Sequence, residues 1–146
     1  MQYTTLNKVL NLLEEACGQH AQITSFLFGE DSEISTQQEL YPLVVANITT
    51  ATISDKTLVL PLIIQVLDIQ RTNEDNLRDT YSDCLAIAQD LYAMMSNPDN
   101  EDYFLIQQNV SLEPISEAYP DIVNGWRMTL NLELAQTRDR CFIPSK

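Results

Sequence analysis

Hydrophobic and polar positions follow two different periods along this chain, and the clearest change of period falls between Lys56 and Met95. The segment TLVLPLIIQVLDIQ is apolar on both alternating faces, which predicts a strand that needs cover on each side. After the polar RTNEDN, the segment LRDTYSDCLAIAQDLYAMM has the spacing of a helix with one apolar face. That face contains Leu77, Tyr81, Cys84, Leu85, Ala88, Leu91, Tyr92 and Met95. The pattern predicts a sheet covered by helices, with this helix running from about Glu74 to Met95.

The N-terminal segment has the same helical spacing. Its apolar face contains Leu6, Val9, Leu10, Leu13 and Cys17, and it predicts a helix from about Thr5 to Cys17. Thr4 or Thr5 is suited to cap its start, and Gly18 is suited to end it in a left-handed conformation. Residues 23–30 have strand character, and the polar segment that follows them predicts a loop.

Residues 41–54 are rich in β-branched side chains, and Ser54 to Lys56 form a plausible turn. We therefore expect residues 41–54 and the apolar strand after them to form a long hairpin. Pro61 has no N–H for a central ladder, so it predicts an edge or a bulge, with the outer hairpin projecting. Residues 98–102 predict a turn, and residues 103–115 and 124–134 predict two more strands, of which the last alternates apolar and polar side chains.

This order of helix, strands, helix and strands predicts an α+β fold with a mainly antiparallel sheet, two helices packed on one face, and the long projecting hairpin. With 146 residues, the chain is long enough for one hydrophobic core. We expect one domain over residues 1–137 and a C-terminal tail, 138–146. The tail holds Arg138, Arg140 and Lys146, and it is basic where the rest of the chain is acidic.

The formal charge of -13 repels phosphate backbones, so nucleic acid is not expected as a directly bound partner. No apolar run approaches the roughly 20 residues of a membrane-spanning helix. The start of the chain lacks the pattern of a secretion signal, and the three cysteines lack the spacing of a zinc site or a disulfide framework. A reducing cytoplasm suits those thiols.

The sequence contains no recognisable catalytic set. His20 is the only histidine, and at a helix end it is interpreted as a solvated or carbonyl-bonded side chain. Cys17 and Cys84 lie on apolar faces and are interpreted as buried core residues. The acidic turn with Asp99, Glu101 and Asp102 lacks the order of a calcium loop, and we expect no metal and no cofactor.

Four segments carry a resemblance to a known family. They are the opening LNKVLNLLEEA, the hairpin YPLVVANITTATISDKTLVLPLIIQVLDIQ, the helix NEDNLRDTYSDCLAIAQDL and the late strand NGWRMTLNLEL. In this order they resemble the tail-terminator and tail-completion (neck, head-tail joining) proteins of tailed bacteriophages. The end of the chain, DRCFIP, resembles the ends of such proteins in phages of Bacteroidetes hosts.

The resemblance implies a non-enzymatic virion protein, assembled in the host cytoplasm, that forms a homomeric ring of roughly six or more copies. Its partners would be other neck, portal or tail-tube proteins, and DNA would pass through the ring without being specifically bound. The expected interface residues are Leu58, Val59, Leu60, Leu62, Ile63, Arg138, Arg140, Phe142 and Ile143. The expected channel-facing acidic residues are Glu30, Asp31 and Glu33.

Two other functions remain open at the level of sequence. One is an acidic cytoplasmic adaptor or inhibitor module, whose acidic face mimics DNA or binds a basic protein. The other is an enzyme that uses carboxylates, although no acidic residues converge on a recognisable pattern. For the apolar strand, burial of both faces within one protomer is the alternative to an interface.

Overall fold

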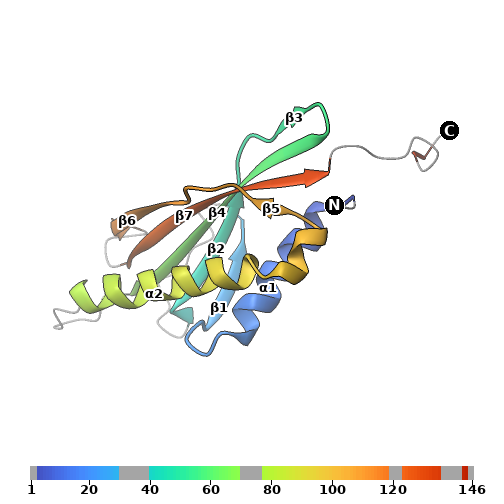
Figure 1. The fold of residues 1–146 in the computed structure, drawn as a ribbon. Coiled ribbons are helices and arrows are strands. Elements are labelled where there is room, and N and C mark those ends of the chain that lie inside the picture. The colour runs from blue at the N-terminus through green and yellow to red at the C-terminus, as the bar shows by residue number, and fades with distance from the viewer. Residues whose placement is uncertain (1–2, 30–39, 70–76, 119–122, 136–142, 145–146) are drawn as a thin grey trace.

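The chain folds into one twisted sheet with both helices on the same side of it (Figure 1). The computed structural model describes residues 3–29, 40–69, 77–118, 123–135 and 143–144. The elements are α1 (Leu6–Gln19), β1 (Ser25–Phe28), β2 (Leu43–Ile48), β3 (Thr52–Ser54), β4 (Thr57–Ile69), α2 (Leu77–Met95), the 3-10 helix η3 (Pro98–Asp102), β5 (Leu105–Ile106), β6 (Ser111–Ala118) and β7 (Val123–Ala135). The fold is α+β with a mixed, mostly antiparallel sheet of seven strands.

Helix α1 begins where the sequence predicts, but it ends two residues later. The Thr5 hydroxyl caps the helix by accepting a hydrogen bond of 3.2 Å from the Lys8 backbone N–H. The expectation that Gly18 takes a left-handed conformation is wrong, since the helix continues through Gln19 and the cap at His20 is extended. The His20 N–H closes the helix by donating to the Cys17 carbonyl at 3.3 Å.

Helix α2 packs on both the sheet and α1, and its buried face is rotated from the predicted one. Cys84, Ala88, Leu91 and Met95 are buried as expected. Tyr92 is 40% exposed, while Thr80 and Ile87 are buried although the pattern did not include them; Leu85 is only partly buried. The predicted start at Glu74 lies outside the described residues.

Strands β4 and β7 form the centre of the sheet, and they pair along the whole length of β4. The main strand order is β1-β2-β4-β7-β5, with β3 paired to β4 and β6 paired to β7. Strands β1 and β2 are parallel, and all other pairs are antiparallel. The apolar side of β7 faces the helices as predicted, and Met128, Leu130, Leu132 and Leu134 are each at most 1% exposed.

Pro61 lies in a central strand, so of the two positions expected for it, an edge or a bulge, the sheet edge is wrong. Its carbonyl accepts a hydrogen bond of 3.3 Å from the Thr49 N–H, so its backbone is directed toward β2 and β3 and away from β7. On that side, β2 has ended at Ile48 and β3 has not begun, and the missing N–H therefore meets a break in the ladder.

The same break means that the long projecting hairpin is not confirmed. Residues 41–54 do not form one strand but contribute β2 and β3, which pair with different parts of β4. Only β3 forms a tight hairpin with β4, through a turn at Asp55 and Lys56. This short hairpin lies at the end of the sheet away from β1 (Figure 1).

A second, smaller core covers the sheet face opposite the helices. Leu67 and Ile69 of β4 are at most 4% exposed there. The buried residues that pack with them are Tyr41, Leu43, Val45, Ile115 and Val123. Over this half of β4, one protomer therefore buries both faces of the strand. Among the described residues, none of the helices has the length and apolar character needed to cross a membrane.

Candidate interaction surface

One row of paired residues, which crosses the sheet from strand to strand, has an open sheet edge at each end. Leu105 of β5 is opposite Glu133 of β7, Glu133 is opposite Val59 of β4, and Val59 is opposite Thr52 of β3. At this level the sheet is four strands wide. Within the described part of the chain, neither β3 nor β5 has a second strand partner. Open edges offer unpaired backbone groups to another chain.

Both edge strands carry large exposed apolar side chains. Ile53 in the middle of β3 is 67% exposed, and Leu105 at the start of β5 is 42% exposed. Every residue of β3 is exposed. Single exposed apolar residues are normal on a monomer, but here they lie on the two edge strands that end this row.

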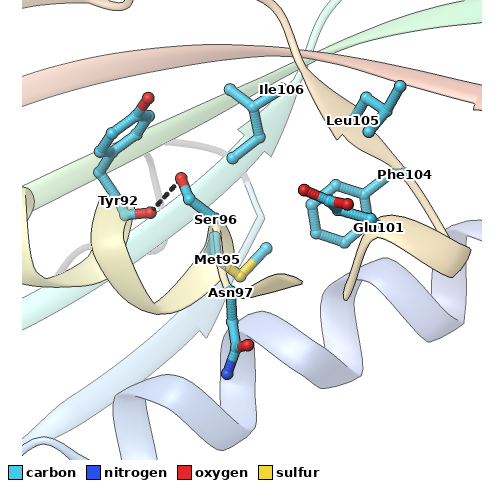
Figure 2. Close-up of a pocket in the computed structure, with 8 residues that line it drawn as sticks. All are labelled: Tyr92, Met95, Ser96, Asn97, Glu101, Phe104, Leu105 and Ile106. Atoms are coloured by element: carbon cyan, nitrogen blue, oxygen red, sulfur yellow. Dashed lines mark hydrogen bonds between the residues drawn. The ribbon is translucent and has the colours of Figure 1, made fainter. Parts of the chain in front are cut away.

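A pocket of about 160 Å³ lies beside β5 on the helix side of the sheet (Figure 2). It is lined by Tyr92, Met95, Ser96, Asn97, Glu101, Phe104, Leu105 and Ile106. The Ser96 hydroxyl donates a hydrogen bond of 2.7 Å to the Tyr92 carbonyl, so it is already engaged. These eight residues include one carboxylate and no histidine, cysteine or lysine. The pocket therefore lacks a nucleophile with an adjacent base, and its lining is mixed, with polar groups beside apolar ones.

A second hollow of about 350 Å³ lies beside β3, between the start of α1 and the ends of β4 and β7. Its lining is mostly apolar and includes Tyr3, Leu6, Ile53, Leu58 and Leu134. Tyr3 is 50% exposed and Leu6 is 36% exposed. The apolar surface around β3 thus extends from the strand onto the first residues of α1.

The residues of β4 that were predicted to form an interface are divided between the core and the surface. Leu60 is 6% exposed and Leu62 is 0% exposed, and both lie in the main core beneath the helices. Side chains that are buried within a protomer have no surface to offer to a neighbour. Leu58, Val59 and Ile63 are only partly buried, so the predicted interface is retained for these three.

The other predicted site residues lie mainly outside the described residues. This applies to Arg138, Arg140 and Phe142 of the tail and to Glu30, Asp31 and Glu33 of the acidic set. Ile143 is described, and it is 53% exposed. The structure therefore does not bring the tail and β4 residues together as one site.

His20 links the two helices instead of remaining solvated or bonding to a carbonyl. Its Nε2 lies 2.9 Å from Asp90 Oδ2, while Nδ1 accepts a hydrogen bond of 3.1 Å from the Gln22 N–H. Because Nδ1 accepts, Nε2 carries the proton and donates it to Asp90. This pair joins the end of α1 to α2, and it does not supply a free base.

Cys17 and Cys84 are buried, as their positions on apolar faces predict, with 3% and 1% exposure. Burial raises the pKa of each thiol to about 12, with smaller contributions from Glu14 at Cys17 and from Asp68 and Asp83 at Cys84. A thiol with so high a pKa is protonated at neutral pH and is not a nucleophile.

No group of three or more His, Cys, Asp or Glu side chains suited to a metal ion occurs among the described residues. At the acidic turn that was considered for calcium, the Asp99 N–H instead donates to Asn97 Oδ1 at 3.0 Å and begins η3. The carboxylates of this turn are charged groups at the surface close to the pocket beside β5.

Ile53 and Leu105 do not stand out in the sequence, because strands of two or three residues are too short to produce a period. The only sequence signal was that each is a large apolar residue close to a turn. No protein-family model matches the sequence, and no curated protein matches it either.

Proposed function

We propose that the protein is a structural subunit of the neck or tail end of a tailed bacteriophage, where copies of the chain form a homomeric ring. The ring would end the tail or join it to the portal and connector proteins. This function is the one that the resemblance in the opening helix, the paired strands, the second helix and the late strand implies.

The row with two open edges is the observation that carries the proposal. A subunit with one free edge at β3 and another at β5 has two different surfaces, as head-to-tail assembly requires. A contact of this heterologous type closes into a ring when the rotation between neighbours divides a full turn evenly.

The charge of the chain supports the same function. With a net charge of -13, a ring of these subunits would repel DNA and offer few binding sites for its phosphates. DNA that passes through such a ring would not be retained. Tight, salt-sensitive binding of DNA by the purified protein would contradict this part of the proposal.

The decisive experiment measures the mass of the full chain in solution and searches for it in purified phage particles. The proposal expects a large multiple of the 16.6 kDa protomer, ring-shaped particles in electron micrographs, and peptides of this chain in virions. A chain that stays monomeric at high concentration and is absent from particles would overturn it. Binding of that monomer to a basic protein would favour an acidic adaptor instead.

The basic tail offers a separate test. Removal of residues 138–146 takes away three of the eight basic residues, and we expect it to weaken association with an acidic neighbouring copy. Assembly that is unchanged after this deletion would remove the tail from the interface.

A further inference from the structure

The backbone of Ile53 faces out of the sheet at the free edge of β3. In antiparallel strands, successive residues direct their N–H and C=O groups alternately toward the two neighbours. The carbonyl of Pro61 accepts a hydrogen bond from the Thr49 N–H. The backbone polar groups of Pro61, and of Val59 two residues before it, are therefore directed to the side of β4 on which β3 lies. Thr52, opposite Val59, therefore directs its N–H and C=O toward β4. The next residue, Ile53, directs its N–H and C=O away from β4, out of the sheet.

The backbone of Ile106 faces out of the sheet at the opposite edge. The Gln107 N–H donates a hydrogen bond of 2.9 Å to the Asn131 carbonyl, so the backbone polar groups of Gln107 are directed toward β7. By the same alternation, the residue before it directs its N–H and C=O away from β7. Each free edge thus offers one outward donor and one outward acceptor on an isoleucine.

The side chains of these two residues lie on the same side of the sheet. Ile53 is opposite Leu58, and Ile106 is opposite Leu132. Leu58 and Leu132 both pack in the main core on the helix side. Because paired residues share a face, Ile53 and Ile106 also point to the helix side.

The strand directions also match. Strand β3 is antiparallel to β4, β4 is antiparallel to β7, and β7 is antiparallel to β5. Strands β3 and β5 therefore run in opposite directions in one sheet. A second copy placed beside the first in the same orientation brings its β3 antiparallel to β5, with the helix sides of both sheets aligned.

We propose that β3 of one copy adds to β5 of the next copy, with Ile53 directly opposite Ile106. The two isoleucines exchange their outward backbone hydrogen bonds, and the Ile53 side chain packs at the pocket beside β5, against the exposed ring of Tyr92 (Figure 2). This inference rests on the proposed ring, and it names the contact that would build it.

Charge supports this register. In an antiparallel pair, the residues that follow Ile53 in one copy lie beside the residues that precede Ile106 in the other. Lys56, at the exposed turn of the hairpin, then falls opposite Tyr103, next to the exposed Glu101 and Asp102. Asp55 of the same turn falls one residue further from these acids, opposite the buried Phe104. Opposite charges at the rim of an interface favour one register over its alternatives.

Cross-linking of two singly substituted copies tests the contact. Both copies carry Cys141→Ser, and Cys17 and Cys84 are retained because burial keeps them unreactive. One copy carries Ile53→Cys and the other Ile106→Cys. Directly opposed residues in a hydrogen-bonded pair have Cα atoms about 5.5 Å apart, which is within the range of about 4.4–6.8 Å for a disulfide. The matched control replaces Ile106→Cys with Phe28→Cys, at the exposed end of β1.

The inference expects a disulfide between the Ile53→Cys and Ile106→Cys copies and none with the Phe28→Cys copy. Large assemblies without this disulfide would overturn the contact while leaving the ring in place. A disulfide only between two Ile53→Cys copies would indicate a two-fold pairing of β3 strands and would also overturn it. A chain that is monomeric throughout would overturn both the contact and the ring.

Charge reversal gives a second readout that needs no cysteine. Lys56→Glu alone and Glu101→Lys alone are each expected to weaken association about two- to fivefold, the effect of an exposed ion pair. A single chain with both substitutions is expected to recover the affinity of the unmodified protein, because the opposite charges meet again across the interface. Equal losses that simply add in the double variant would contradict the proposed register.

Discussion

The indole N–H of Trp126 on β7 donates a hydrogen bond of 2.9 Å to the backbone carbonyl of Tyr81 on α2. The two rings also meet edge to face, with centroids 6.0 Å apart and planes inclined by 68°. This contact fixes one end of α2 on the sheet. Since Trp126 is the only tryptophan, its fluorescence reports the docking of the helix.

Trp126→Phe is expected to lower the free energy of unfolding by about 1 kcal/mol, because a ring remains but the hydrogen bond is lost. Chemical denaturation followed by circular dichroism measures this change. Tyr92→Phe is the control, since Tyr92 lies on the same helix and is 40% exposed, and it should alter stability very little. A loss at Tyr92 equal to that at Trp126 would show that the indole hydrogen bond is not the cause.

Gly125→Ala is expected to destabilise the protein by more than about 2 kcal/mol or to prevent folding. A Cβ atom at this position would lie 1.9 Å from the carbonyl oxygen of Val66 in the neighbouring strand, where the backbone cannot move without disturbing the central pair. The free energy of unfolding, or the yield of folded protein, measures the effect.

Gly18→Ala is the matched control for that substitution. Nothing lies within 4 Å of a Cβ atom there, and the residue is inside α1. Alanine is favoured over glycine in a helix, so this variant should be more stable by roughly 0.5–1 kcal/mol. If both glycine variants were equally tolerated, the close approach between β4 and β7 would not constrain the sheet.

The sequence was sufficient to predict the fold class and the two helices, because the helical period and the Thr5 cap are local signals. It was not sufficient for features that depend on neighbouring elements. The rotation of the buried face of α2, which leaves Tyr92 exposed, follows from its packing on both α1 and the sheet. Pro61 was assigned to an edge or a bulge because its missing N–H is visible in the sequence, whereas the break between β2 and β3 opposite it is not.

The candidate surface was less predictable than the fold. Apolar residues of β4 suggested an interface, but Leu60 and Leu62 are used in the protomer's own core. The exposed residues of the candidate surface, Ile53 and Leu105, are on β3 and β5, whose short length leaves no periodic signal. Pairing across the sheet, which depends on distant segments, is what identifies these strands as edges.

Stability is expected to decrease with rising pH above about 9, because the pKa of Cys84 is raised from 9.0 to about 12 by burial and by the charges of Asp68 and Asp83. Between these two values the unfolded chain loses the thiol proton and the folded chain keeps it, so unfolding is favoured as pH rises. The slope is at most about 1.4 kcal/mol per pH unit for each such thiol, and Cys17 adds a second.

Urea denaturation of the protein and of Cys84→Ala, at about pH 8 and at about pH 11, measures this dependence. The difference in stability between the two proteins should shrink or reverse at the higher pH, since the variant lacks one of the two buried thiols. Tyr41 has a pKa that burial and Asp68 raise above 10.0, and it contributes the same sign in both proteins, so it cancels in the comparison. A difference that is identical at the two pH values would contradict burial of the Cys84 thiol.

Leu105→Lys is expected to reduce assembly strongly if β5 is an edge that joins copies, because a lysine at a sheet edge opposes the addition of another strand. Phe28→Lys is the matched control. Both residues are 42% exposed, and both substitutions change the net charge equally, but Phe28 lies on β1 at the other end of the sheet. Sedimentation velocity at several concentrations measures the distribution of masses. Leu105→Lys should shift it toward the protomer while Phe28→Lys leaves it unchanged, and equal shifts would mean that charge, and not the β5 edge, controls association.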